Sequence, residues 1–253
     1  MPLEVRRTPH VLHVDWWWIA LQVAMVTAAV FVYFRVRGLT EGSPETAVAN
    51  ARDLMDVERA TGLDVEDGLQ DVLLHWDWLV APANWVYMYG HWPVIAATLV
   101  WLAVRHRDRY VRLRDAMMIS GGIGLFIFAL YPVAPPRLAG LGIVDTVSER
   151  SIAYRVLQPP AFVNQYAAMP SLHAGWDLLV GLAIAGAAAY AWLRWAGYLL
   201  PVLMAAAVIL TGNHFVLDVL AGIAVALVGL LAADAVDRHW RRPRAHLRPA
   251  LGT

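Results

Sequence analysis

The sequence predicts an all-α integral membrane protein with six transmembrane helices and an extracytoplasmic amphipathic helical segment between helices 1 and 2. Of its 253 residues, 59% are hydrophobic and 16% are charged, and the mean hydropathy is +0.51. Six apolar stretches are long enough to cross a hydrocarbon core of ~30 Å, which takes ~17–25 residues. These stretches cover residues 16–36, 84–104, 115–133, 175–193, 197–213 and 215–236.

The distribution of arginine predicts how these helices are oriented. The chain contains no lysine, so its 20 basic side chains are all arginine. With six spans, four arginine groups share one side: Arg6 and Arg7; Arg105, Arg107, Arg109, Arg112 and Arg114; Arg194; Arg238, Arg241, Arg242, Arg244 and Arg248. The positive-inside rule makes that side cytoplasmic, so both termini are expected there. Arg35 and Arg37 are exceptions, because they lie at the outer end of the first stretch.

The segment between the first two spans is expected to lie outside and to form two amphipathic helices. The first begins at Ser43-Pro44-Glu45, where serine caps the helix and proline takes its first position. Its apolar residues recur at helical spacing until Gly62, a residue suited to a helix end. Leu69, Val72, Leu73 and Trp76 indicate the second helix. The chain is therefore predicted to have three parts. Residues 1–83 contain span one and this segment, residues 84–236 form a five-helix catalytic core, and residues 237–253 form a basic cytoplasmic tail.

Several classes of protein and site are excluded by what the sequence lacks. Without cysteine there are no disulfides, thiolate metal sites or cysteine nucleophiles. No nucleotide-binding glycine loop or nucleic-acid signature is present, so neither a cofactor nor a nucleic-acid partner is expected. The first apolar stretch is not followed by a small-residue cleavage site, and we therefore expect a retained helix.

Polar residues with chemical potential gather at the predicted outer ends of four spans. They are Arg137 after span three, Ser171 and His173 at span four, and Asn213, His214 and Asp218 between spans five and six. Ionisable side chains are costly in a membrane and are functional candidates by default. His214 and Asp218 are four residues apart, which puts them on one face of a helix, where the carboxylate can set the tautomer of the imidazole.

Each of these residues also has a purely structural interpretation. His214 and Asp218 can be a helix-stabilising pair, and Ser171 after Pro170 can cap span four. Arg137 can anchor a headgroup or clamp a phosphate. His91 is balanced between a structural and a phosphate-binding role, while Asp177 and Glu58 are weaker candidates. His173, His214 and Asp218 can also bind zinc, although Arg137 on the same side opposes a cation.

Two motifs in this set resemble those of a known family. Pro170-Ser171-Leu172-His173 matches a Pro-Ser-x-His motif, and His214 to Asp218 matches His-x-x-x-Asp. Together they resemble the type 2 phosphatidic acid phosphatase superfamily of membrane phosphatases and phosphotransferases, over about residues 85–236. The phosphatase branch usually has lysine and Arg-Pro near the end of span three, Ser-Arg before the nucleophilic histidine, and glycine at the position of Leu172. This chain has Pro135-Pro136-Arg137 and Ala207-Val208 there, so the pattern looks closer to the inositol phosphorylceramide synthase-like, or inositolphosphotransferase, branch.

The resemblance implies a metal-independent enzyme that acts on lipid phosphate esters at the outer leaflet of the cell membrane. It implies that His214 attacks phosphorus, Asp218 orients His214, and His173 serves as general acid and base. Arg137, Ser171, Asn213 and His91 are expected to bind the substrate phosphate. The acceptor is water or an inositol-like alcohol, which leaves hydrolysis to inorganic phosphate open beside transfer of a phospho-headgroup. A lipid carrier or transporter subunit that uses the histidines as a proton relay also remains open.

Overall fold

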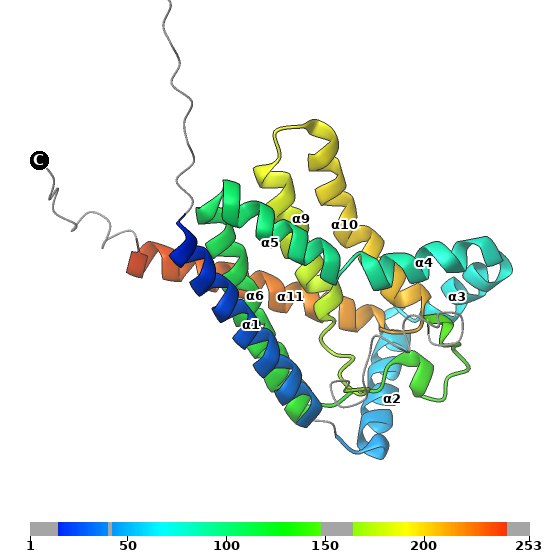
Figure 1. The fold of residues 1–253 in the computed structure, drawn as a ribbon. Coiled ribbons are helices and arrows are strands. Elements are labelled where there is room, and N and C mark those ends of the chain that lie inside the picture. The colour runs from blue at the N-terminus through cyan, green and yellow to red at the C-terminus, as the bar shows by residue number, and fades with distance from the viewer. Residues whose placement is uncertain (1–14, 40–41, 148–163, 242–253) are drawn as a thin grey trace, which may run out of the picture.

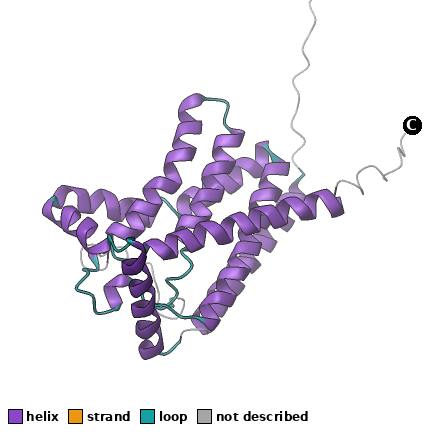
Figure 2. Cartoon of the chain, turned by 180° about the vertical axis from the view of Figure 1, so that it is seen from behind, coloured by secondary structure: helices purple, strands orange, loops and turns teal. Residues whose placement is uncertain are grey.

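The computed structural model describes residues 15–39, 42–147 and 164–241, with the side chains of residues 77, 240 and 241 excepted. All regular structure in these ranges is helical, which confirms the all-α part of the predicted fold class (Figures 1 and 2). The α-helices are α1 (Trp16–Leu39), α2 (Pro44–Thr61), α3 (Glu66–His75), α4 (Asp77–Tyr89), α5 (Trp92–Arg105), α6 (Arg107–Leu130), α9 (Leu172–Ala187), α10 (Ala191–Leu210) and α11 (Val216–Val236). Arg6, Arg7, Arg242, Arg244 and Arg248, which entered the predicted topology, lie outside the described residues.

Four helices in the described part are long and apolar enough to cross a membrane, namely α1, α6, α10 and α11. Helices α4 and α5 make a fifth candidate if they form one span, which is bent by 44° at the break between Tyr89 and Trp92. Helix α9 is apolar but has only 16 residues. It ends at Ala187, before the predicted limit of span four, so the structure supports four or five spans rather than all six.

The first helix of the segment between α1 and α4 forms as its sequence predicts. The Ser43 hydroxyl accepts a hydrogen bond from the Thr46 N–H at 3.2 Å, and Pro44 takes the first position. Gly62 ends α2 in the left-handed conformation, at a φ of 74° that costs glycine little. The apolar face of α2 packs inward, with Ala47, Ala51, Leu54 and Met55 all buried. This packing supports the helical spacing seen in the sequence.

Helix α3 also forms, but its inward face differs from the predicted one. Leu69, Val72 and Trp76 are exposed, and only Leu73 of the predicted set is buried. The other buried residues of α3 are Glu66 and Gln70. The reason is that α3 covers backbone ends of other helices, whose N–H and C=O groups need polar partners. The hydrophobic pattern therefore predicted the helix correctly, but it predicted the wrong face of the helix to be buried.

Helix α9 lies at the centre of the molecule and packs against α5, α6, α10 and α11. Its contact with α11 is very close, because a Cβ atom on Gly222 would collide with the Ser171 carbonyl and one on Gly175 with the Gly222 carbonyl. Small residues allow helices in membranes to approach at this distance. The Ser171 N–H also donates to the Asp218 carbonyl at 2.8 Å. The starts of α9 and α11, which carry the two motifs, are thereby held together.

Candidate active site

His173 and His214 are neighbours in the folded chain, as the sequence predicted. His173 is in the first turn of α9, and His214 lies two residues before α11. Their ring centroids are 5.8 Å apart. This contact follows from the close approach of α9 and α11 at their glycines.

His214 and Asp218 form a buried pair at the start of α11. The distance from His214 Nδ1 to Asp218 Oδ2 is 3.3 Å. The same carboxylate oxygen accepts the Phe215 N–H at 2.9 Å, so the aspartate is fixed to the backbone that carries the histidine. Asp218 is fully buried and His214 nearly so. A carboxylate in this position favours the tautomer with the proton on Nδ1 and leaves the Nε2 lone pair for chemistry.

Two glutamates from the segment between α1 and α4 cap α11. The Val216 N–H donates to Glu66 at 2.8 Å, and the Leu217 N–H donates to Glu58 at 2.7 Å. The first N–H groups of a helix have no partner within the helix, and the helix dipole favours negative charge there. Glu66 was absent from the predicted site, and Glu58 was only a weak candidate. No local sequence pattern connects either glutamate to a helix that begins about 150 residues later.

Glu58 is held in an unusual electrostatic environment. The pKa of its carboxyl group is raised to about 8, mainly by burial and also by the nearby carboxylates of Glu66 and Asp218, while the Leu217 N–H opposes the shift. Within the described residues, Glu58 Oε2 and Asp218 Oδ1 are buried without a hydrogen-bond partner. Three acidic side chains therefore surround the start of α11, and the raised pKa lets Glu58 retain its proton near neutral pH.

Arg137 is fixed by hydrogen bonds to two side chains. Its Nε donates to Asp145 Oδ2 at 2.9 Å, and its Nη1 donates to Asn213 Oδ1 at 2.8 Å. The amide of Asn213 in turn donates to the Thr211 hydroxyl at 2.8 Å. Asn213, predicted to bind phosphate, thus holds Arg137 in place. Because Asn213 directly precedes His214, this contact sets the arginine beside the histidine.

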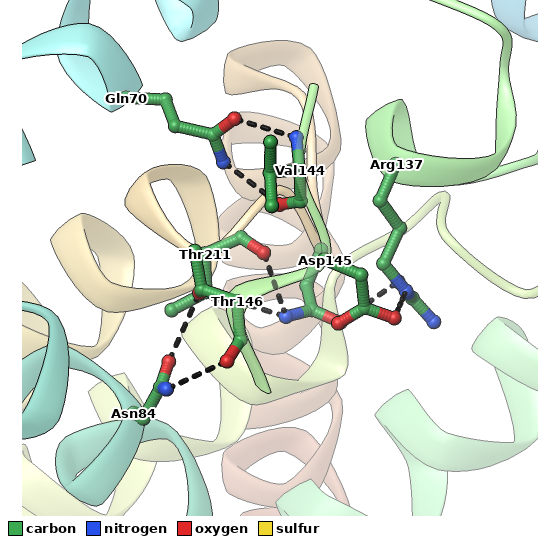
Figure 3. Close-up of polar contacts among 8 residues, drawn as sticks. Gln70, Asn84, Arg137, Val144, Asp145, Thr146 and Thr211 are labelled. Carbon is green, nitrogen blue, oxygen red and sulfur yellow. Dashed lines mark hydrogen bonds and ion pairs between the residues drawn. The ribbon is translucent and has the colours of Figure 1, made fainter. Parts of the chain in front are cut away.

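The loop that carries Asp145 is braced by α3 and α4 (Figure 3). Gln70 of α3 accepts the Val144 N–H at 2.6 Å and donates to the Val144 carbonyl at 3.0 Å. Asn84 of α4 donates to the Thr146 carbonyl at 2.9 Å. Asp145 lies between these two anchored residues, so its carboxylate is presented to Arg137 in a fixed position.

A second buried pair, which the sequence did not connect, joins His91 to Asp177. His91 Nδ1 and Asp177 Oδ1 are 2.7 Å apart, and both side chains are buried. His91 lies at the break between α4 and α5, and Asp177 is one turn after His173 on α9. The His91 ring centroid is only 4.4 Å from that of His173. The bend in the helix pair thus delivers a third imidazole to the site.

These groups line one cavity of about 730 Å³. Its lining includes five of the predicted or newly found polar residues, His91, Arg137, His173, Asn213 and His214, together with Arg37 of α1. Arg37 was not predicted as a site residue. Its predicted position on the side of the membrane opposite to the other arginine groups was the signal in the sequence that could have identified it. Ser171 is fully buried, and its hydroxyl accepts the Ala174 N–H at 3.5 Å as a helix cap. Among the described residues, no group of three or more histidine, aspartate or glutamate side chains is arranged to hold a metal ion.

Comparison with known protein families matches residues 52–232 to the PAP2 superfamily. The chain belongs to this superfamily. The match covers both motifs and every residue lining the cavity except those of α1. Members of the PAP2 superfamily are typically phosphatases, and membership therefore supports an enzyme of the lipid phosphatase and phosphotransferase type. No curated protein and no solved structure gives a significant match.

Proposed function

We propose that the protein moves a phosphoryl or phospho-headgroup from a membrane lipid to water or an alcohol through a phosphohistidine at His214. The observation that carries this proposal is the shared cavity, in which two neighbouring histidines face a fixed arginine. A nucleophile, a proton donor and a phosphate-binding cation are the parts that phosphoryl transfer through a covalent intermediate needs.

The chemistry divides between the two histidines. His214 Nε2 attacks phosphorus, and the bond from phosphorus to the leaving oxygen breaks. His173 gives its proton to that oxygen, so that an alcohol leaves. In the second half-reaction His173 takes a proton from water or an alcohol, whose oxygen displaces His214 from phosphorus. Asp218 holds the His214 ring and stabilises the positive charge that develops on it.

The phosphate oxygens are bound by arginine and by the start of α9 in this proposal. Arg137 is pre-oriented by Asp145 and Asn213, and Arg37 adds a second cation to the cavity wall. Backbone N–H groups at a helix start favour anions, which gives Ser171 its part as the cap residue of α9. Fixed donors of this kind stabilise the charge that spreads over the phosphoryl oxygens in the transition state.

The lipid tail is accommodated by a second, mostly apolar hollow of about 560 Å³ between α1, α5 and α6. This hollow adjoins the cavity of the site, because both share Thr27, Val30, Tyr33, Trp92 and Trp176. A lipid that enters sideways from the bilayer can therefore keep its chain among apolar side chains while its phosphate reaches the histidines.

The inositol phosphorylceramide synthase-like branch remains our proposal for the reaction type, with simple hydrolysis as the alternative. The deciding experiment incubates the purified protein with phosphatidic acid and with phosphoinositol lipids, with and without free inositol, and identifies products by mass spectrometry. Headgroup transfer to inositol supports the branch. Release of inorganic phosphate alone supports the phosphatase alternative, and no turnover of any substrate contradicts the enzymatic proposal in favour of a lipid carrier or transporter.

We further propose that α9 and the α4–α5 pair complete six spans, with both termini cytoplasmic and residues 38–83 outside. Arginine asymmetry supports this orientation. The exposed Ala60 of α2 can be changed to cysteine in a chain that has no other cysteine. In intact cells, a membrane-impermeant thiol reagent should label Ala60→Cys. Labelling only after permeabilisation means that the orientation is reversed.

Metal independence is part of the same proposal. Arg137 and Arg37 line the cavity beside the histidines and disfavour a divalent cation there. We therefore expect turnover to persist in EDTA. Loss of activity in EDTA that zinc restores would contradict the phosphohistidine mechanism.

A further inference from the structure

Three imidazoles lie in a row along the active-site cavity, and each end of the row contacts a buried carboxylate. From one end to the other the row runs Asp177, His91, His173, His214 and Asp218. The proposed chemistry uses His173, His214 and Asp218. The other two residues, His91 and Asp177, are both buried and make the shorter of the two carboxylate–imidazole contacts.

Burial makes this second pair costly unless it has a use. Asp177 is fully buried, and among the described residues its Oδ2 has no hydrogen-bond partner. A buried carboxylate with one unsatisfied oxygen destabilises the fold relative to an apolar side chain of similar size. Its Oδ1 is directed at His91 Nδ1. The pair therefore resembles the His214–Asp218 pair in chemistry although it comes from different parts of the chain.

The surroundings of His91 fix its ring against His173. The Trp176 ring stacks on the His91 ring with an interplanar angle of 8° and a centroid distance of 6.0 Å. Trp176 is itself fixed, since its Nε1 donates to the Ser120 hydroxyl at 3.1 Å. The free face of His173 is limited further by Tyr87, whose ring centroid is 4.9 Å away. His173 is thus held between rings rather than by a carboxylate of its own.

We propose that His91 and Asp177 are positioning residues that work through His173. They orient its ring for proton transfer and supply the negative charge that balances its protonated form. This inference rests on the proposed function, because it assumes that His173 protonates the leaving oxygen. In this arrangement Asp218 serves the nucleophile and Asp177 serves the proton donor. No bond to phosphorus is formed by the His91–Asp177 pair.

The test compares two substrates that differ in their need for a proton. A lipid alkyl phosphate has a poor leaving group that must be protonated, whereas 4-nitrophenyl phosphate has a leaving group that departs as an anion. Loss of general acid catalysis typically costs ~10²–10⁴-fold for the former. We expect Asp177→Asn and His91→Gln to slow kcat for the alkyl phosphate by about one to two orders of magnitude while changing 4-nitrophenyl turnover much less.

A double-variant cycle separates this role from independent effects. If His91 acts through His173, adding His91→Gln to His173→Ala costs no further rate with the alkyl phosphate. Independent, multiplying losses overturn the proposal. An equal loss for both substrates with a raised KM also overturns it and instead supports the phosphate-binding role predicted for His91 from the sequence.

A matched control variant and a conservative test variant make the result interpretable. Asp234→Asn makes the same chemical change in the Arg112–Asp234 ion pair between α6 and α11, and it should leave the ratio of the two substrate rates unchanged. Asp177→Asn keeps a side-chain oxygen that can accept from His91, so it tests charge with little change of shape. If His173→Ala itself has no leaving-group dependence while His214→Ala is inactive, the failure lies in the acid–base role given to His173, and the positioning proposal falls with it.

Discussion

The two carboxylate–histidine pairs of the site have the same chemistry in opposite surroundings. The His214–Asp218 pair lies among polar groups, including Glu58, Glu66 and the amide of Asn213. The His91–Asp177 pair lies against Trp92 and Trp176, which continue into the apolar hollow between α1, α5 and α6. The comparison suggests that one pair faces the phosphate and the other faces the lipid alcohol and its chain.

The largest expected effect concerns the nucleophile. His214→Ala should abolish turnover and phosphoenzyme formation with every substrate, because no covalent intermediate can form. His173→Ala should still accumulate an acid-labile, base-stable phosphohistidine from 4-nitrophenyl phosphate. Rapid-quench labelling followed by acid and base treatment measures both. Normal turnover in His214→Ala, with an inactive and unlabelled His173→Ala, means that the roles are reversed.

The arginines near the phosphate side should give the next largest effect. Arg137→Ala should lower kcat/KM by about 10²–10³-fold for both substrates, as loss of a fixed charge-stabilising donor does. Arg37→Ala should lower it by a smaller factor. Arg35→Ala is the matched control, since Arg35 is exposed on the same helix and does not line the cavity. Equal effects of Arg35→Ala and Arg37→Ala in steady-state assays would remove Arg37 from the site.

A side chain that fills the apolar hollow should impair binding of the lipid tail without impairing binding of the phosphate. Gly122 of α6 lines this hollow, and a Cβ there would meet no atom within 4 Å. Gly122→Leu should therefore lower kcat/KM for a long-chain lipid phosphate by about tenfold while sparing 4-nitrophenyl phosphate. Gly68→Leu, at an exposed and uncrowded position in α3, serves as the control. If Gly122→Leu changes kcat/KM equally for the two substrates or not at all, the acyl chain of the lipid binds outside this hollow.

The smallest expected effect is on stability and comes from Glu58. Its pKa is raised from 4.5 to about 8 by burial, so between these values the folded protein keeps a proton that the unfolded chain has lost. The folded state is therefore stabilised most below the unfolded pKa, and this contribution is lost as pH rises toward 8 and through it. Melting temperatures of the detergent-purified protein should fall over this range, and Glu58→Gln should flatten the profile. An unchanged profile in the variant assigns the pH dependence to other groups.

The sequence could predict those parts of the fold and site that depend on local patterns. Apolar stretches identified the long helices, and the Ser43-Pro44 start and Gly62 end of α2 were readable because capping is a local interaction. His214 and Asp218 were recognisable as a pair for the same reason, since four residues make one helical turn.

Long-range contacts could not be predicted in this way. His91 and Asp177 are 86 residues apart, and only the bend between α4 and α5 brings them together. The apolar spacing of α3 pointed to Leu69, Val72 and Trp76 and missed the buried Glu66 and Gln70, because periodicity reports polarity and not which backbone ends a helix will cover. Arg37 broke the arginine pattern, and that exception marked a residue that lines the cavity.

The glutamate caps on α11 have a consequence for how the protein is made. Glu66 and Glu58 precede their backbone partners by 150 and 159 residues. Until the ribosome has released α11 into the membrane, these carboxylates lack the N–H groups they accept in the finished protein. The N–H groups at the start of α11, beside the proposed nucleophile, are thus bound by two side chains that were synthesised long before them. A nascent chain that ends before Asn213 already contains Arg137, His91 and His173, yet it lacks both the proposed nucleophile His214 and the Leu217 N–H that binds Glu58.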